Sequence, residues 1–238
     1  MAFSLFLSFE SKAKKQPVLS PTDKAGVVAL VRGLPGLLQG RVFTPADGRS
    51  TDKHHKDDGP GPVLTIQADF VNIQDLETAC AATSPLRHLA DPLYFPSLKG
   101  VPGRHQAFAT RYLPVPEQWD EDETTTWCTY LVEYPGPASD WNLWLREYLD
   151  HHPVIMSKFP NLRQIEISSP AQFVTALPFA IATAMQRNKV VFESLAELNS
   201  AMATPVRAEM AGDPARHVPI KGATTHFPMN TRLVLPPG

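Results

Sequence analysis

The chain has little of what marks an exported, zinc-binding or membrane protein. It holds two cysteines, Cys80 and Cys128, without C-x-x-C spacing, which argues against a disulfide framework or a cysteine zinc site and favours a cytoplasmic location. No run approaches the roughly 18 apolar residues that cross a bilayer. Lys and Arg together number 22 against 24 Asp and Glu, so no surface for nucleic acid is expected.

Motifs for common cofactors are also missing. The sequence contains no G-x-G-x-x-G, P-loop or G-x-S-x-G pattern, so neither a nucleotide cofactor nor a serine nucleophile is expected. His54 and His55 lie in the charged, glycine-containing stretch DGRSTDKHHKDDGPGP, without H-x-x-x-H or H-E-x-x-H spacing. We expect a mobile loop there. The sequence therefore predicts no metal site and no cofactor.

What the sequence does contain is internal similarity. The stretch GLPGLLQGRVFTPA resembles KFPNLRQIEISSPA, with Pro35 matching Pro160. DLETACAATSPLR resembles ELNSAMATPVR, and GRHQAFATRYLPVP resembles GATTHFPMNTRLVLP, in the same order along the chain. Three ordered matches indicate a duplication. They predict two domains, residues 1–120 with a degenerate site and residues 121–238 with the candidate site.

The hydrophobic periodicity gives both halves the same order of elements. Strands are expected at 3–9, 38–43, 63–70 and 108–115 with helices at 21–32 and 73–82, then strands at 127–134, 162–168, 189–192 and 225–234 with helices at 140–152 and 195–203. The order βαββαβ is typical of a ferredoxin-like unit. The predicted fold is α+β: two tandem ferredoxin-like repeats packed sheet to sheet as a dimeric α+β-barrel.

The second half also resembles a known family. The run MQRNKVVFESLAELNSAMATPVRAEMAGD, the segment Tyr148-x-x-x-His152-Pro153 followed by FPNL, and the closing THFPM are similar to the EthD family of dimeric α+β-barrel proteins in tandem-domain form. The resemblance implies a small cavity between sheet and helices, and either a homodimer or a monomer with an intrachain pseudo-dimer. Relatives in the wider superfamily include monooxygenases, isomerases, dehydratases, polyketide cyclases and haem enzymes, so fold does not select a reaction.

The candidate site rests on helical spacing. Trp144, Tyr148 and His152 recur every four residues and should share one stripe, with His151 rotated about 100° away. Pro153 should end or kink the helix and direct the His152 imidazole towards a cavity. His152 would then act as general base, with Tyr148 orienting it or the substrate. The alternative is a histidine that only stabilises a helix end.

These observations lead to one main functional prediction with two alternatives. The predicted catalytic residues are His152, Tyr148 and His226, and the predicted substrate-binding residues are Arg187, Trp144 and Tyr130. The main prediction is a cofactor-independent enzyme of a catabolic or secondary-metabolic pathway, an isomerase, lyase, cyclase or oxygenase that acts on a hydrophobic or aromatic small molecule. The alternatives are a non-catalytic accessory protein that binds such a ligand, and a haem protein.

Overall fold

The computed structural model describes residues 1–238 except 14–15, 56–57, 60, 118–121, 214–217 and 238. The elements of the first half are β1 (Ala2–Phe9), α1 (Pro21–Arg32), β2 (Leu37–Pro45), β3 (Leu64–Phe70), α2 (Ile73–Ala79), the short 3-10 helices η1 (Pro85–Ala90) and η2 (Pro96–Leu98), and β4 (Gly103–Leu113). Those of the second half are β5 (Thr126–Tyr134), α3 (Trp141–Met156), β6 (Gln164–Pro170), β7 (Ala180–Ile181), β8 (Gln186–Phe192), α4 (Leu195–Met202), α5 (Pro205–Gly212) and β9 (Thr225–Val234).

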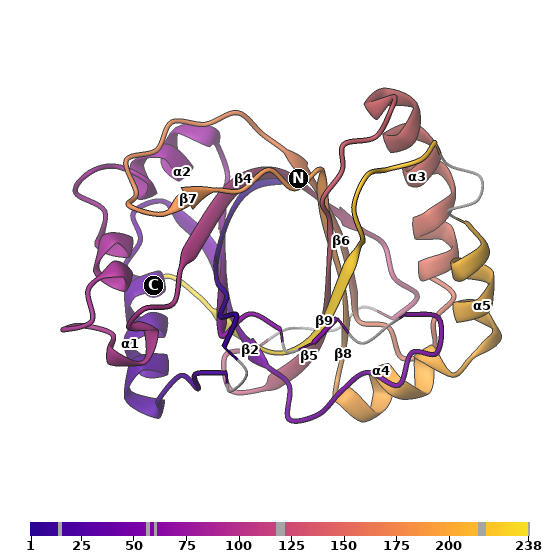
Figure 1. The fold of residues 1–238 in the computed structure, drawn as a ribbon, viewed down its shortest axis with the longest axis horizontal. Coiled ribbons are helices and arrows are strands. Elements are labelled where there is room, and N and C mark those ends of the chain that lie inside the picture. The colour runs from indigo at the N-terminus through magenta and orange to yellow at the C-terminus, as the bar shows by residue number, and fades with distance from the viewer. Residues whose placement is uncertain (14–15, 56–57, 60, 118–121, 214–217, 238) are drawn as a thin grey trace.

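The strands form a closed barrel, which Figure 1 shows nearly end-on. Among the described residues, eight strands pair in the order β1-β3-β2-β9-β5-β8-β6-β4, and β4 pairs back with β1. Every ladder of this ring is antiparallel. The short strand β7 adds a parallel pairing to β4 outside the ring.

The predicted fold, two tandem ferredoxin-like repeats packed sheet to sheet as a dimeric α+β-barrel, is wrong. The strands of the two halves pair edge to edge, with Gly40 of β2 opposite Val234 of β9 and Phe108 of β4 opposite Pro170 of β6. These ladders satisfy backbone groups that an open sheet would leave unpaired at its edges. One closed barrel replaces two stacked sheets. The domain division at residue 120 stays a prediction, since its boundary includes residues 118–121, outside the described residues.

Helices cover the barrel on two opposite sides in Figure 1, α1 and α2 on one and α3, α4 and α5 on the other. Alternation along β1 shows how the sequence produces this arrangement. Leu5 and Leu7 are fully buried in a cluster with Val27 and Val31 of α1. Ser20 caps that helix by accepting the Asp23 backbone N–H at 3.0 Å. Outward apolar side chains therefore hold the helices against the wall.

The inward side chains of the barrel are largely polar. Ser4 of β1 donates to Asp69 at 2.6 Å, and Thr65 donates to Ser8 at 3.0 Å. An apolar group separates the charged parts of the interior, and its buried members are Phe6, Phe43, Phe108, Leu131, Ala184 and Met229. The interior is thus packed with side chains, which leaves the outer faces of the wall as the place for a ligand.

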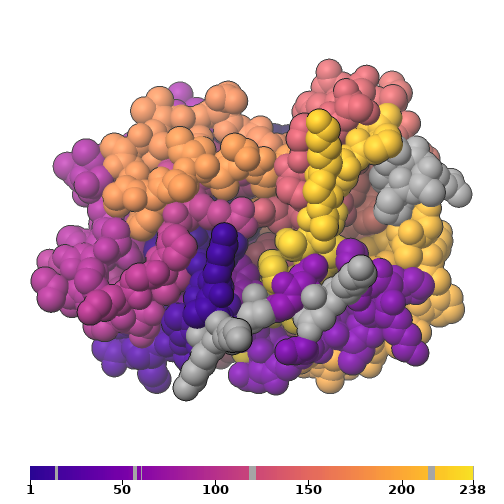
Figure 2. Space-filling view, in the orientation of Figure 1, coloured from indigo at the N-terminus to yellow at the C-terminus, as the bar shows by residue number. Residues whose placement is uncertain are grey.

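A long connection from β2 to β3 crosses the outside of the barrel. Figure 2 shows this segment in purple lying against the yellow β9 on the visible face. Ala46 donates its backbone N–H to Pro228 of β9 at 3.1 Å. In the part of the chain that the structure describes, no helix has both the length and the apolar character that crossing a membrane requires.

Candidate functional site

The β2–β3 connection is fastened to the second half of the chain at several points. The Thr51 backbone N–H donates to the side chain of Asn199, in the second turn of α4, at 2.8 Å. Arg207 of α5 donates to Asp52 at 2.7 Å, and the side chains of this ion pair are 5% and 2% exposed. A buried pair of this kind requires good geometry, since both charges have left water. The connection is therefore held over the outer face of β9 and β5.

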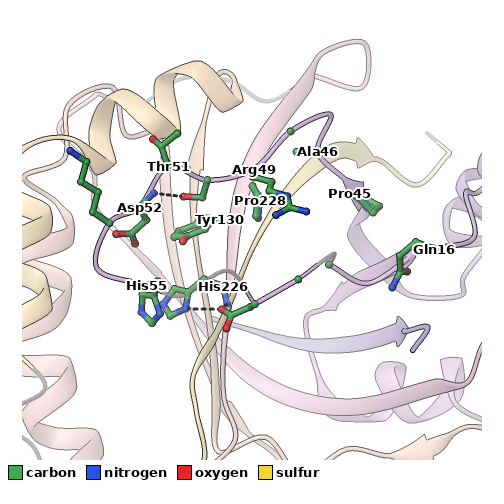
Figure 3. A pocket seen from close by; sticks show the side chains of 16 residues that line it. Gln16, Pro45, Ala46, Arg49, Thr51, Asp52, His55, Tyr130, His226 and Pro228 are labelled. Carbon is green, nitrogen blue, oxygen red and sulfur yellow. Dashed lines mark hydrogen bonds and ion pairs between the residues drawn. The ribbon is translucent and has the colours of Figure 1, made fainter. Parts of the chain in front are cut away.

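A pocket of about 810 Å³ lies beneath this connection (Figure 3). Its floor consists of Tyr130 from β5 with His226 and Pro228 from β9. Its walls come from Gln16 and from residues between Pro45 and Gly61. The lining combines apolar groups with charged side chains, and the charged members from the walls are Arg49, Asp52, Lys53 and Asp58. This mixture suits a small molecule that has an apolar body and a polar or ionisable group.

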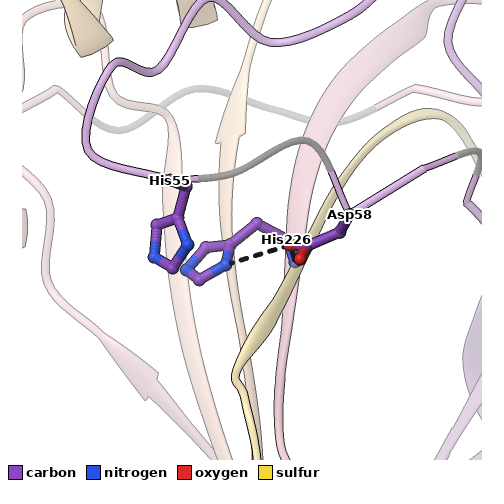
Figure 4. A group of neighbouring side chains, drawn as sticks. All are labelled: His55, Asp58 and His226. Atoms are coloured by element: carbon purple, nitrogen blue, oxygen red, sulfur yellow. Dashed lines mark hydrogen bonds and ion pairs between the residues drawn. The ribbon is translucent and has the colours of Figure 1, made fainter.

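One edge of the pocket holds a cluster of three ligand-type side chains: His55, Asp58 and His226 (Figure 4). The ring centroids of the two histidines lie 3.4 Å apart. Asp58 accepts the backbone N–H of His226 at 2.8 Å, while Nδ1 of the same histidine lies 3.7 Å from the carboxylate. That ring nitrogen is buried and makes no hydrogen bond among the described residues.

The surroundings set the protonation of the cluster. Burial, followed by the positive charges of His226 and Arg207, lowers the pKa of His55 to about 4. Burial also lowers the pKa of His226, and the nearby Asp58 carboxylate only partly offsets it. Burial opposes ionisation of Asp58, but its contacts with His226 prevail and lower the Asp58 pKa. Near pH 7 the cluster therefore holds two neutral imidazoles and one carboxylate.

Tyr130 borders the cluster on the pocket floor. Its ring centroid lies 5.4 Å from that of His226. Burial raises the pKa of Tyr130 to about 12, so its hydroxyl keeps its proton near pH 7. The floor thus offers an aromatic face and a hydroxyl next to two neutral imidazoles.

The structure separates the six residues that the sequence predicts as a site. His226 and Tyr130 line the pocket, whereas Trp144, Tyr148 and His152 lie between α3 and the barrel wall and do not line it. The predicted stripe is confirmed, because these three side chains are buried while His151 is exposed. Catalysis by His152 and Tyr148 stays a prediction.

The surroundings of α3 account for this burial. His152 Nδ1 lies 2.7 Å from the Asp213 carboxylate, and the Asn188 side chain of β8 donates to the Tyr148 hydroxyl. Trp144 stacks on Tyr148 with ring centroids 5.0 Å apart. The helix continues through Pro153 to Met156, so the expected helix end at His152 is wrong. Pro153 has no N–H to donate to the carbonyl four residues earlier, so the helix lacks one backbone hydrogen bond at this position.

Arg187 lies on the opposite face of the wall, inside the barrel. Its guanidinium pairs with Glu133 at 2.5 Å and stands over the Phe6 ring, 5.1 Å from the centroid. The side chain is 4% exposed. Arg187 is thus already paired with a protein carboxylate and does not line the pocket, and its role in substrate binding stays a prediction.

Two members of the pocket cluster, His55 and Asp58, were outside the predicted site. Their segment was predicted to be a charged loop, because its histidines lack metal-ligand spacing, and the third member of the cluster, His226, lies about 170 residues away in the sequence. The available signal was the density of histidine and aspartate in DKHHKDD. Such density is common in solvated loops, so it is insufficient without the partner.

Comparison with known proteins identifies the fold. No family model matches the chain, and no curated protein matches its sequence. Among solved structures, an "anthrone oxidase-like protein" aligns over 98% of this chain and 93% of its own, with a TM-score of 0.58 and 11% identity. A "putative monooxygenase from Lactobacillus acidophilus NCFM" aligns over 98% and 95%, with a TM-score of 0.54 and 8% identity. The chain shares the barrel fold of these proteins.

The EthD resemblance receives less support. An EthD family protein from Bacillus halodurans C-125 aligns over 42% of this chain and 94% of its own, with a TM-score of 0.34 and 16% identity. A match at this level does not decide membership. The fold is that of the two aligned barrel structures described above, and the EthD family itself stays a prediction.

Proposed function

We propose that the chain is an oxygenase-type enzyme that binds a small aromatic substrate in the pocket beneath the β2–β3 connection. The observation that carries this proposal is the pocket itself, where the neutral imidazoles of His55 and His226 adjoin an apolar floor. The likeness in fold to an "anthrone oxidase-like protein" and to a "putative monooxygenase" favours oxygenation over other reactions. Because proteins that share a fold can catalyse different reactions, the proposal rests on the residues of the pocket.

The lining indicates the substrate class. Tyr130, Pro228, Pro45 and Ala46 offer apolar contact for a ring system, and a volume of about 810 Å³ accommodates several fused rings. Neutral histidine accepts a hydrogen bond or a proton from an acidic O–H or from a C–H next to a carbonyl. The proposed substrate is therefore a phenolic or carbonyl-bearing aromatic compound with such an acidic position.

The proposed reaction begins with proton transfer. His226 takes the proton from the substrate, and Tyr130 donates a hydrogen bond to the oxygen on which negative charge develops. The electron-rich anion then gives electrons to dissolved O₂. When a ring methylene becomes a carbonyl, one oxygen atom enters the substrate and the other leaves as water, which balances the four-electron oxidation.

The test measures oxygen uptake. Purified protein is supplied with a panel of anthrones, naphthols and other phenolic compounds in an oxygen electrode, and products are identified by mass spectrometry. Ala46→Trp should fill the pocket and raise KM by about tenfold or more. The matched control is Ala208→Trp on the exposed side of α5, away from the pocket, which should leave KM unchanged.

Other outcomes point to other functions. Product without oxygen uptake would favour the isomerase, lyase or cyclase predictions, and tight binding without product would favour the accessory protein. Equal effects of Ala46→Trp and Ala208→Trp would refute the pocket as the site. A Soret band in the spectrum of the purified protein would favour the haem protein.

A further inference from the structure

The cluster at the pocket edge has the geometry of a cation site. His55, Asp58 and His226 each offer one ligand atom, and these atoms lie within 4.8 Å of one another. Atoms bound to one transition-metal ion at about 2.0–2.2 Å lie roughly 3 to 4 Å apart, so a small adjustment of the side chains brings them to a common ion. Two imidazoles and one carboxylate are a donor set typical of zinc and of non-haem iron.

Unused hydrogen-bonding capacity points the same way. The side chain of His226 is only 10% exposed, and its Nδ1 has no hydrogen bond among the described residues, although it faces Asp58 at 3.7 Å. A buried nitrogen that makes no hydrogen bond costs free energy. A bound cation would occupy that gap and satisfy the nitrogen.

A backbone hydrogen bond also positions Asp58, the carboxylate of the cluster. Asp58 accepts the His226 N–H at 2.8 Å, which fixes the carboxylate beside the rings before any ion arrives. Hydrogen bonds of this kind orient metal ligands and raise affinity. His55 and Asp58 belong to the β2–β3 connection, and His226 belongs to β9 of the barrel wall. An ion bound by all three residues would therefore also link this connection to the wall.

We propose that His55, Asp58 and His226 bind one divalent transition-metal ion, with the remaining coordination positions open to the pocket. Three protein ligands leave room for water or for a substrate oxygen. The inference shares its location with the proposed function and deepens it: the two histidines would act on the substrate through the ion instead of directly. Metal binding itself does not require a substrate, so it is tested separately.

The experiment titrates full-length protein, stripped with a chelator, with Zn²⁺ and with Co²⁺. Calorimetry should give about one ion per chain, and Co²⁺ should produce visible absorption bands from nitrogen ligands. His55→Gln, Asp58→Asn and His226→Gln should each weaken affinity by about tenfold or more. Circular dichroism checks that each variant is folded.

The adjacent histidine supplies a matched control. His54 is exposed and lies outside the cluster, so His54→Gln should leave metal affinity unchanged. Absence of stoichiometric binding overturns the inference, and so does a loss in His54→Gln equal to that in His55→Gln. Oxygen uptake by chelator-treated protein that binds no metal would leave the proposed function intact, whereas specific binding without turnover would support the metal site alone.

Discussion

Replacing Lys189 with methionine should destabilise the protein strongly, because the charge lies inside the barrel. Lys189 Nζ lies 3.0 Å from Glu166, and Arg41 lies 3.2 Å from Asp69 and 3.7 Å from Glu166. Their side chains are at most 2% exposed. Two cations therefore balance two carboxylates in a region removed from bulk water, and Gln67 also accepts from Lys189 at 3.2 Å.

The expected magnitude follows from this burial. Methionine keeps most of the side-chain volume but leaves Glu166 short of a cation, and removing one partner of a buried pair costs about 3–5 kcal/mol. With a urea slope near 3 kcal/mol/M, the midpoint should fall by about 1 M or more. The matched control is Lys158→Met. Lys158 pairs with Glu209, and both side chains are 48% exposed, so this substitution should lower the free energy of unfolding by about 1 kcal/mol or less.

A double variant separates charge from packing. Lys189→Met combined with Glu166→Gln restores charge balance, so it should recover a large part of the loss seen in Lys189→Met. Urea unfolding is followed by circular dichroism and tryptophan fluorescence, and coincident curves justify a two-state analysis. If Lys189→Met costs no more than Lys158→Met, the barrel interior is hydrated and the reasoning fails.

Two further predictions concern the first half of the chain. Burial lowers the pKa of His105, so the folded state disfavours its protonated form. As the pH falls below about 6.5, the unfolded chain binds a proton that the folded state resists. The free energy of unfolding should therefore fall by up to about 1.4 kcal/mol per pH unit. His105→Gln should flatten the decline between pH 6.5 and 5 in urea titrations, and an unchanged slope would contradict this. Gly40→Ala should cost about 1–3 kcal/mol, because the new Cβ meets Val31 of α1. Adding Val31→Ala should recover part of that loss of stability. If it recovers none, the loss comes from a change in the β2 backbone and not from the contact with Val31.

Local patterns in the sequence were sufficient for most individual elements. The helix predicted at 21–32 coincides with α1, and the strand predicted at 225–234 coincides with β9. Period and capping residues specify such elements within a short window. The helix α5 was missed, because no element was predicted between the helix at 195–203 and the strand at 225–234. Pro205 could have signalled its start, since proline is well suited to a first helical turn.

The long-range arrangement could not be predicted in the same way. Alternation along β9 shows that Phe227 and His226 face opposite sides of the wall, but it does not say which side holds the pocket. The stripe of Trp144, Tyr148 and His152 correctly identified a buried face, which turned out to be packing against the wall. The pairing of β2 with β9 joins the two halves of the barrel and brings the β2–β3 connection to the pocket floor, and no local sequence pattern encodes this pairing.

That pairing has a consequence for how the protein is made. Gly40 of β2 pairs with Val234 of β9, which is much later in the sequence, so during translation the hydrogen-bonding edge of β2 stays unpaired until β9 has been synthesised. Exposed strand edges promote association between chains, and distant contacts slow folding. The nascent chain should therefore depend on chaperones until β9 has been made, and the pocket, which needs β9 for its floor, can form only after that strand has been synthesised.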